Sequence, residues 1–536
     1  MKKILLFSPM LLALLAVNSV PVKEFVPAKA ESAPTSGSLP SKMNIDLNDS
    51  TSDEIRAYYS SLNSLNDEER QGTNILKNLK PILQNFTYYS YDTCWKIYEI
   101  TDREWTLSPA EETTYGTYDS STNTIKDYQF GTSTSNSRNN PYLHDLYKNR
   151  DEKGVTLEAG RLKAWDNHGS TGGGTDREHV WCQSRGFKAS SGASGPAGTD
   201  VHHLMAGDSR TNQSLHNNNP YGYVDKNKSY TDGTKYLDYI AGNMLGAPVK
   251  TSEDDESTVV FEPQDCDKGD IARACFYMVA CYNNLSGSDT ITQFNPNLTL
   301  ADYATSNGNS EASSATHAVA MGIMSDLLEW NRIDPVDEFE IHRNNLIYKN
   351  FQHNRNPFID FPQWADYIWG DEIGTTIKPA SDRINNSGLS ISASELTIKP
   401  GSTYQISATV DGNAYVNWSL NKEGIVSIDK IATLSKEAVT ITALSEGEVD
   451  LTASALVDGE LVNKACHIVV SNDTPNNEET EGIPRLYIYI GLAVLAVIVI
   501  IVIIVIIAVP SSRKKAKKTV KKVAKKQIKQ ATKKKK

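Results

Sequence analysis

The spacing of hydrophobic residues divides the chain into two regions of different periodicity. In the first region, hydrophobic residues recur every three or four positions, as at Ile55, Tyr58, Leu62 and Leu65, which predicts an amphipathic helix. Further helices are predicted at residues 75–86, 91–100, 269–282, 321–330 and 336–348. Polar, glycine-rich segments with short predicted strands separate some of these helices. We therefore predict one α+β domain over residues 51–380.

The second region alternates hydrophobic and polar residues with a period of two. Ile406 and Ala408 belong to one such segment, and glycines separate several of the segments. This pattern is typical of short, half-buried strands, so we predict an all-β sandwich over residues 387–471. The region resembles the bacterial Ig-like repeats of surface proteins, and Trp418 stands where such a domain has its core tryptophan.

The N-terminal segment has the composition of an export signal. Residues 1–30 contain two early lysines, a short hydrophobic run and a small-x-small sequence at positions 28–30, which predicts a cleaved signal peptide. Residues 31–50 are rich in Ser, Pro, Asn and Asp, and we expect a disordered linker there.

The C-terminal segment has the composition of a membrane anchor. After a polar linker at 472–485, residues 486–509 are uncharged and long enough to cross a bilayer, which predicts a single transmembrane helix. In the tail at 510–536, the last 24 residues hold 14 Lys or Arg and no acidic residue. The positive-inside tendency predicts a cytoplasmic tail on anionic lipid and an extracellular body, hence a single-pass protein of the cell membrane.

Charge and cysteine content limit the functional classes. The formal net charge is −11 despite the basic tail, so the rest of the chain is strongly acidic. A duplex-binding protein usually has a basic surface, and any role on nucleic acid must therefore depend on a local site. Six cysteines are too few for a disulfide-based scaffold, and their pairing stays open.

Three segments carry residue types that suit phosphodiester cleavage. Residues 176–181 read Asp-Arg-Glu-His-Val-Trp, residues 199–204 read Thr-Asp-Val-His-His-Leu, and Asn212 follows. A histidine can deprotonate water near neutral pH. A hard divalent cation on oxygen ligands can stabilise the charge that builds on the phosphate. Neighbouring side chains of a strand point to opposite faces, so Glu178 and His179 share one phosphate only where the backbone bends or the phosphate lies at the strand edge.

These motifs resemble the bacterial endonuclease I and secreted ribonuclease family, of the His-Me finger (ββα-metal) type. The resemblance includes Arg-Glu-His-Val-Trp at 177–181, Gly-Thr-Asp-Val-His-His-Leu at 198–204, and Asn-Arg-Asn-Pro-Phe-Ile-Asp at 354–360. It extends over roughly residues 70–370 in several ordered blocks. The resemblance implies an α+β His-Me finger nuclease domain that binds DNA or RNA and reads little sequence.

The resemblance also implies roles for individual residues. His179 would activate the attacking water, while Glu178 and Asn212 would hold Mg²⁺, with Mn²⁺ or Ca²⁺ as substitutes. Arg177 and Asp200 complete the candidate catalytic set, Asp200 as a group that could orient an imidazole. No protein partner is implied.

The chain departs from the family pattern near these motifs. Cys182 stands where the family usually has proline, and Met205-Ala206 replaces Arg-Pro. The family arginine expected shortly after Asn212 is absent, and Arg210 or His216 could take its place.

Three alternatives stay open at this stage. His202 and His203 suit structural roles better than catalytic ones. Cys182 together with the histidines could instead bind zinc, although the spacing matches no closed zinc pattern. The chain could also be a surface adhesin whose Ig-like domain binds a ligand and whose nuclease domain is degenerate.

Overall fold

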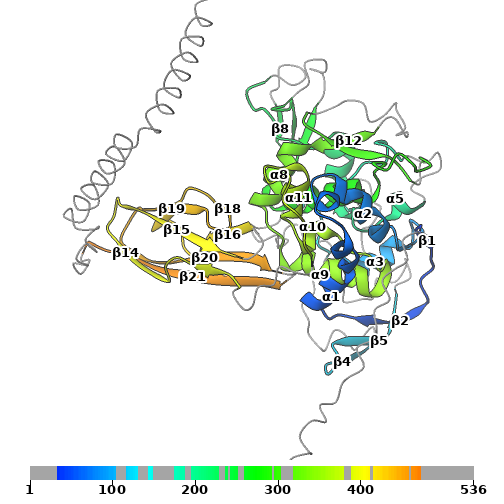
Figure 1. Cartoon of the computed structure of the whole chain (residues 1–536), viewed down its shortest axis with the longest axis horizontal. Coiled ribbons are helices and arrows are strands. Elements are labelled where there is room, and N and C mark those ends of the chain that lie inside the picture. Colours follow the sequence, from blue (N-terminus) through cyan, green and yellow to red (C-terminus); the bar gives the residue numbers. More distant parts are fainter. Residues whose placement is uncertain are drawn as a thin grey trace, which may run out of the picture. The chain divides into compact units, whose positions relative to one another are not determined.

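The computed structural model in Figure 1 describes residues 33–103, 116–130, 143–148, 174–187, 195–228, 236–238, 242–250, 259–292, 295–303, 318–379, 388–410, 415–457 and 460–472. Its helices are α1 (Ser52–Tyr58), α2 (Asn74–Leu83), α3 (Cys94–Thr101), α5 (Gly195–Thr199), α6 (Ser209–Thr211), α7 (Lys268–Cys281), α8 (Met324–Ile333), α9 (Glu338–Leu346), α10 (Pro357–Asp360) and α11 (Trp364–Trp369). Shorter 3₁₀ turns are η1 (Ser60–Ser64), η2 (Glu68–Arg70) and η7 (Asp265–Asp267), and the π-helical turns are η4 (Asn212–His216) and η8 (Ile347–Phe351).

Short strands accompany these helices in the first region. They are β1 (Thr35–Ser36), β2 (Lys42–Asp46), β3 (Thr87–Tyr88), β4 (Thr117–Asp119), β5 (Thr124–Gln129), β6 (Thr175–His179), β7 (Leu204–Asp208), β8 (Tyr236–Asp238), β9 (Met244–Gly246), β10 (Val260–Glu262), β11 (Leu298–Ala301) and β12 (Val319–Ile323). They form small separate sheets of two or three strands, in the orders β1-β3, β2-β5-β4, β6-β7, β10-β9-β8 and β11-β12. This part of the chain is therefore a mixed α/β structure, without a single large sheet among the described residues.

The local sequence explains where the first helix begins. The Thr51 side chain accepts a hydrogen bond from the Glu54 amide, and the Glu54 carboxylate accepts one from the Thr51 amide. This capping box satisfies two amides that the helix itself leaves unpaired. The start of α1 agrees with the periodicity that predicted it.

The core of the first region surrounds α7, which is buried at every one of its 14 positions. The helix packs against α2 and α8. The guanidinium of Arg273, buried on this helix, donates to Glu340 of α9 at 2.7 and 2.6 Å. A buried charge of this kind needs such a partner, because its desolvation alone would destabilise the fold.

The pair β6-β7 leads directly into a helix. The two strands are antiparallel, with Glu178 opposite Met205. After β7, Asp208 caps α6 by accepting a hydrogen bond from the Thr211 amide at 2.8 Å. The chain then continues into η4, so that two strands and a helical segment follow one another around the motif residues.

The structure differs from the prediction at residues 31–50. The sequence predicts a disordered linker, but the described residues from 33 onward include β1 and β2. Strand β2 pairs with β5, and Ile45 and Leu47 are buried in a hydrophobic cluster that includes residues of α3. The mostly polar composition of this segment gave no indication that Ile45 and Leu47 are buried in a core. The linker prediction is therefore wrong for the described residues.

The second region consists of two sheets around one core. Its strands are β13 (Ser390–Ile391), β14 (Glu395–Ile398), β15 (Thr403–Thr409), β16 (Tyr415–Leu420), β17 (Val426–Ile428), β18 (Ala432–Leu434), β19 (Ala438–Ala443), β20 (Gly447–Val457) and β21 (Glu460–Val470). The sheets have the strand orders β13-β15-β19-β17 and β14-β21-β20-β16-β18, and Figure 1 shows them as a β-rich body. Trp418 is buried between them and donates to Thr433 at 2.9 Å. The assignment of this region to the Ig-like class stays a prediction.

One part of the fold prediction is corrected. Within the ranges that the structure describes, no helix is both long and apolar enough to cross a bilayer. The fold class is therefore a mixed α/β structure with a β-rich C-terminal region, and a C-terminal transmembrane helix is not supported. The segments predicted as signal peptide (1–30), transmembrane helix (486–509) and basic tail (510–536) lie outside the described residues.

Candidate active site

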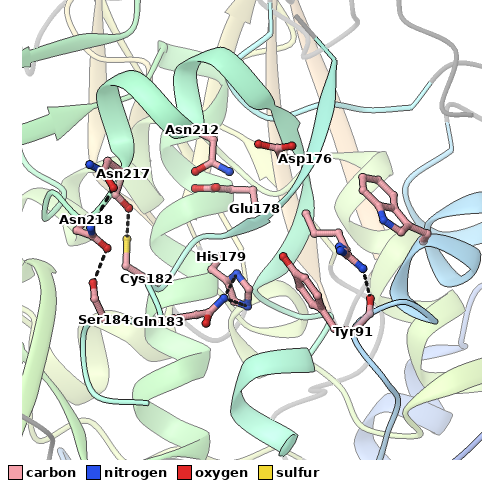
Figure 2. Close-up of a pocket in the computed structure, with 12 residues that line it drawn as sticks. Tyr91, Asp176, Glu178, His179, Cys182, Gln183, Ser184, Asn212, Asn217 and Asn218 are labelled. Atoms are coloured by element: carbon pink, nitrogen blue, oxygen red, sulfur yellow. Dashed lines mark hydrogen bonds between the residues drawn. The ribbon is translucent and has the colours of Figure 1, made fainter. Parts of the chain in front are cut away.

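A cavity of about 440 Å³ opens beside the end of β6. It is lined by Tyr91, Trp95, Asp176, Arg177, Glu178, His179, Cys182, Gln183, Ser184, Asn212, Asn217 and Asn218. Figure 2 shows Glu178, His179 and Asn212 gathered around it from β6 and the start of η4. The structure thus brings these three predicted residues into one cavity.

Glu178 is almost fully buried, and its carboxylate is held from one side. Its Oε1 atom accepts hydrogen bonds from the Tyr147 hydroxyl at 3.0 Å and from Nδ1 of His216 at 2.5 Å. The backbone of Gly207, on the neighbouring strand, lies directly against this residue. A Cβ atom at position 207 would come within 2.8 Å of the Glu178 Cβ, so the glycine leaves room for Glu178.

Figure 2 shows the Asn212 side chain pointing toward the carboxylate of Glu178. Asn212 is half-buried. The side chain that caps the N-terminus of α6 is that of Asp208, and Asn212 does not have this role. Because Asp208 fills the capping role, the Asn212 carboxamide is available for another partner. The side chains of Glu178 and Asn212 therefore present oxygen atoms to the same space.

His179 is the last residue of β6, and its ring contacts one backbone carbonyl and one side-chain amide. Its Nε2 atom lies 2.9 Å from the carbonyl oxygen of Gly198, and the side-chain amide nitrogen of Gln183 lies 3.2 Å from Nδ1 and 3.3 Å from Nε2. Burial lowers the pKa of His179 to about 4, so the imidazole is neutral at pH 7. A neutral ring that donates from Nε2 to a carbonyl keeps the lone pair of Nδ1 for accepting a proton.

Arg177 lines the cavity and packs against two aromatic rings. Its guanidinium carbon is 3.4 Å from the ring centre of Tyr91 and 5.2 Å from that of Trp95. Its Nη1 donates to the Tyr91 carbonyl at 2.6 Å. Tyr91 in turn stacks on His179. The geometry therefore connects Arg177 to His179 through an aromatic ring.

Asp200 is placed elsewhere. Its carboxylate accepts hydrogen bonds from the hydroxyls of Tyr277 and Tyr282, at 2.7 and 2.9 Å, and from the amide of Gln352 at 3.0 Å. It does not line the cavity, and no imidazole donates to it among these contacts. The prediction that Asp200 orients an imidazole has no support in this geometry, because the side-chain donors to its carboxylate are Tyr277, Tyr282 and Gln352.

His202 and His203 have structural partners. Nε2 of His202 lies 3.2 Å from the carbonyl of Asn354, and Nε2 of His203 lies 2.7 Å from the carbonyl of Ala197. Neither ring lines the cavity. Where the chain is described, no group of three or more His, Cys, Asp or Glu side chains is arranged to hold a metal ion. The zinc alternative therefore has no support in the described part.

Several residues around Glu178 were not predicted from the sequence. Tyr147 could not have been found, because it precedes Glu178 by 31 positions in a polar stretch. Cys182 and His216 were noticeable as departures from the family pattern, but nothing in the sequence indicates that they touch. In the structure, Sγ of Cys182 lies 3.5 Å from Nε2 of His216. Burial alone would lower the pKa of His216, but the Cys182 sulfur and the Glu178 carboxylate raise it to about 10.

The chain matches the model of one enzyme family. The family model for Endonuclease I matches residues 72–363, which is more than half of the chain and includes every cavity residue. This chain belongs to the endonuclease I family and is a nuclease. Members of this family are generally metal-dependent.

Two relatives support this assignment. The extracellular ribonuclease of Bacillus amyloliquefaciens is 37% identical over 215 residues, which cover 40% of this chain and 61% of that protein. The extracellular ribonuclease of Bacillus subtilis (strain 168) is 32% identical over 302 residues, covering 56% of this chain and 76% of that protein. Among solved structures, domains 4 and 5 of the S-layer protein SbsC cover 16% of this chain and 46% of that one, at 17% identity and a TM-score of 0.14. A TM-score this low assigns no fold.

These findings correct the predicted localisation. The relatives carry the name of extracellular ribonucleases, and the described residues include no helix able to cross a membrane. A single-pass membrane protein with a cytoplasmic C-terminus is therefore not supported, and neither is the membrane as a partner.

Proposed function

We propose that this chain is a secreted, metal-dependent endonuclease that hydrolyses phosphodiester bonds, with His179 as general base. The observation that carries the proposal is the meeting of Glu178, His179 and Asn212 in one cavity of a chain that belongs to a nuclease family. The adhesin alternative gives no reason for these three side chains to share a cavity.

The proposed role of His179 follows from its hydrogen bonds. With its Nε2 proton donated to the Gly198 carbonyl, the ring keeps one tautomer and one orientation. The lone pair of Nδ1 can then take a proton from a water molecule that attacks phosphorus. In this structure the Gln183 amide lies at Nδ1, so that side chain must turn aside when water binds there.

The residues present fit a hard divalent cation. Glu178 supplies a carboxylate whose Oε2 is not used in the hydrogen bonds described above, and Asn212 supplies a carboxamide that faces it. Magnesium typically takes one or two protein oxygens and keeps several waters. When bound, it would stabilise the negative charge that develops on the phosphate oxygens. The two side chains would be its protein ligands, and Mn²⁺ or Ca²⁺ could substitute.

The substrate class follows from the relatives and from the cavity. Both relatives are named as ribonucleases, so we propose RNA as a substrate and DNA as a second one. Among the described residues, Arg177 is the one Lys or Arg that lines the cavity, in keeping with a site that depends on its bound cation for phosphate affinity. Contacts to the phosphate backbone carry no sequence information, so we expect little cut-site preference.

The experiment is a cleavage assay with the purified protein. Supercoiled plasmid and a long RNA are incubated with Mg²⁺, with a chelator, and with the His179→Ala variant. We expect cleavage that requires the metal and is lost in the variant. Absence of cleavage with the metal, or equal cleavage by His179→Ala, would reject the proposal and favour the adhesin alternative.

A further inference from the structure

A buried chain of side chains leads away from the cavity behind Glu178. Nδ1 of His216 lies 2.5 Å from Oε1 of Glu178, and Nε2 of the same ring lies 3.5 Å from the sulfur of Cys182. The sulfur also lies 3.0 Å from the carbonyl oxygen of Asn217, to which the thiol can donate. Both nitrogens of His216 are thus engaged, one of them with the proposed metal ligand.

The His216 ring cannot easily turn away from Glu178. The residue is only 1% exposed, and its ring stacks on Tyr221 with centroids 4.7 Å apart and planes inclined by 16°. The hydroxyl of Tyr221 is 2.8 Å from that of Tyr147, which is the other donor to Glu178. Packing therefore fixes both groups that hold the carboxylate.

The two hydrogen bonds converge on a single carboxylate oxygen. Tyr147 and His216 both meet Oε1, whereas Oε2 accepts none of the bonds found for Glu178 in the described part of the chain. A free carboxylate rotates about its terminal bond, which would spread its oxygens over many positions. Fixing Oε1 therefore also fixes the direction of Oε2.

We propose that His216 is a positioning residue for metal binding: it holds Oε1 of Glu178 so that Oε2 faces Asn212 across the cavity. This inference rests on the proposed function, because it takes Glu178 as a metal ligand. His216 lies four residues after Asn212 on the same helical segment, so one element carries both a proposed ligand and the group that orients the other. Hydrogen bonds from outer residues to a ligating carboxylate commonly have this effect.

A purely structural role for His216 makes a different prediction. If the ring only fills space, its replacement lowers the thermal stability and the fraction of folded protein, but each folded molecule keeps its metal affinity. If the ring orients Glu178, the affinity itself falls while the number of sites per folded molecule stays the same. Mn²⁺ binding separates these outcomes, since it needs no substrate and no turnover.

The experiment measures Mn²⁺ binding to the full protein by the electron paramagnetic resonance signal of the free ion. The test variant is His216→Leu, which removes both ring nitrogens. The rescue variant is His216→Asn, whose amide can donate from nearly the position of Nδ1. The control is His202→Asn, which alters an equally buried histidine that bonds Asn354 outside the cavity. Circular dichroism establishes that each variant is folded.

We expect His216→Leu to weaken Mn²⁺ binding by about 10- to 100-fold, the usual effect of losing such an outer contact. His216→Asn should recover most of the affinity, and His202→Asn should keep that of the wild type. Wild-type affinity in folded His216→Leu would overturn the inference, as would an equal loss in His202→Asn. A Glu178→Ala variant serves as a reference. If it binds Mn²⁺ like the wild type, the proposed metal site itself is wrong, whereas loss in Glu178→Ala without loss in His216→Leu contradicts only the role of His216.

Discussion

Tyr91 lies against His179 with the ring centroids 5.6 Å apart and the planes inclined by 22°. The tyrosine ring also contacts the guanidinium of Arg177. The imidazole of His179, the candidate general base, therefore packs against the Tyr91 ring, and the Tyr91 ring packs against the Arg177 guanidinium. We propose that Arg177, predicted from the sequence as catalytic, instead positions His179 through this stack.

This stack predicts the effect of removing the ring. Tyr91→Ala should lower kcat by up to about tenfold, because aromatic contacts of this kind contribute about 0.5–1.5 kcal/mol and the imidazole would lose its fixed orientation. Tyr91→Phe keeps the ring and should keep most of the activity. Steady-state kinetics on a labelled RNA measure both variants. Equal loss in Tyr91→Phe would show that the hydroxyl matters and not the stacking.

A second prediction concerns the space beside Glu178. Gly207→Ala should displace Glu178 and reduce metal affinity and kcat together, since the added Cβ would come within 2.8 Å of the Glu178 Cβ. We expect a cost in unfolding free energy of about 1–3 kcal/mol as well. Gly388→Ala is the matched control, because a Cβ there meets nothing within 4 Å. Calorimetric metal titration and thermal unfolding test both variants, and wild-type metal affinity in Gly207→Ala would refute this account of the glycine.

The third prediction separates Asp200 from the chemistry. Asp200→Asn should destabilise the fold by about 1–3 kcal/mol, because the two tyrosine hydroxyls and the Gln352 amide lose a buried charged acceptor. The kcat per folded molecule should stay near that of the wild type. Urea unfolding and kinetics corrected for the folded fraction measure the two effects. A large loss of kcat in a fully folded variant would restore Asp200 to the catalytic set.

The fourth prediction concerns the pH dependence of stability. Burial lowers the pKa of His202 to about 3, against about 6.5 in an unfolded chain. Between about pH 3 and 6.5 the unfolded chain binds a proton at His202 that the folded protein does not bind. The contribution of the neutral, buried His202 to the free energy of unfolding is therefore fully present above about pH 6.5 and is lost as the pH falls toward 3. Urea unfolding between pH 7 and 5 should show this decline. His202→Asn should have a shallower decline, and an unchanged slope would contradict the prediction.

The sequence predicted the elements with strong periodicity better than their surroundings. Helix α1 begins next to the predicted Ile55, because the hydrophobic spacing and the Thr51 cap agree, but it ends at Tyr58, and Leu62 lies in the 3₁₀ turn η1. The strands before it were missed, since β2 has only Ile45 as a fully buried residue and relies on pairing with the distant β5. Pairing between segments about 80 residues apart leaves no local pattern to detect.

In the candidate site, too, the sequence predicted some residues and did not reveal the contacts between distant segments. Glu178, His179 and Asn212 could be selected from their chemistry and from the family resemblance, and all three line one cavity. The contacts that hold them depend on side chains from remote segments, namely Tyr91 behind His179 and Tyr147 beside Glu178. Such contacts follow from tertiary packing, which the sequence alone did not reveal.

The central claim is that one cavity joins a cation held by Glu178 and Asn212 to the imidazole of His179. The most direct measurement is a crystal structure of the protein soaked in Mn²⁺, with anomalous scattering used to locate the ion. We expect an anomalous peak within coordination distance of Oε2 of Glu178 and Oδ1 of Asn212. A peak on other residues, or none there at saturating Mn²⁺, would contradict it.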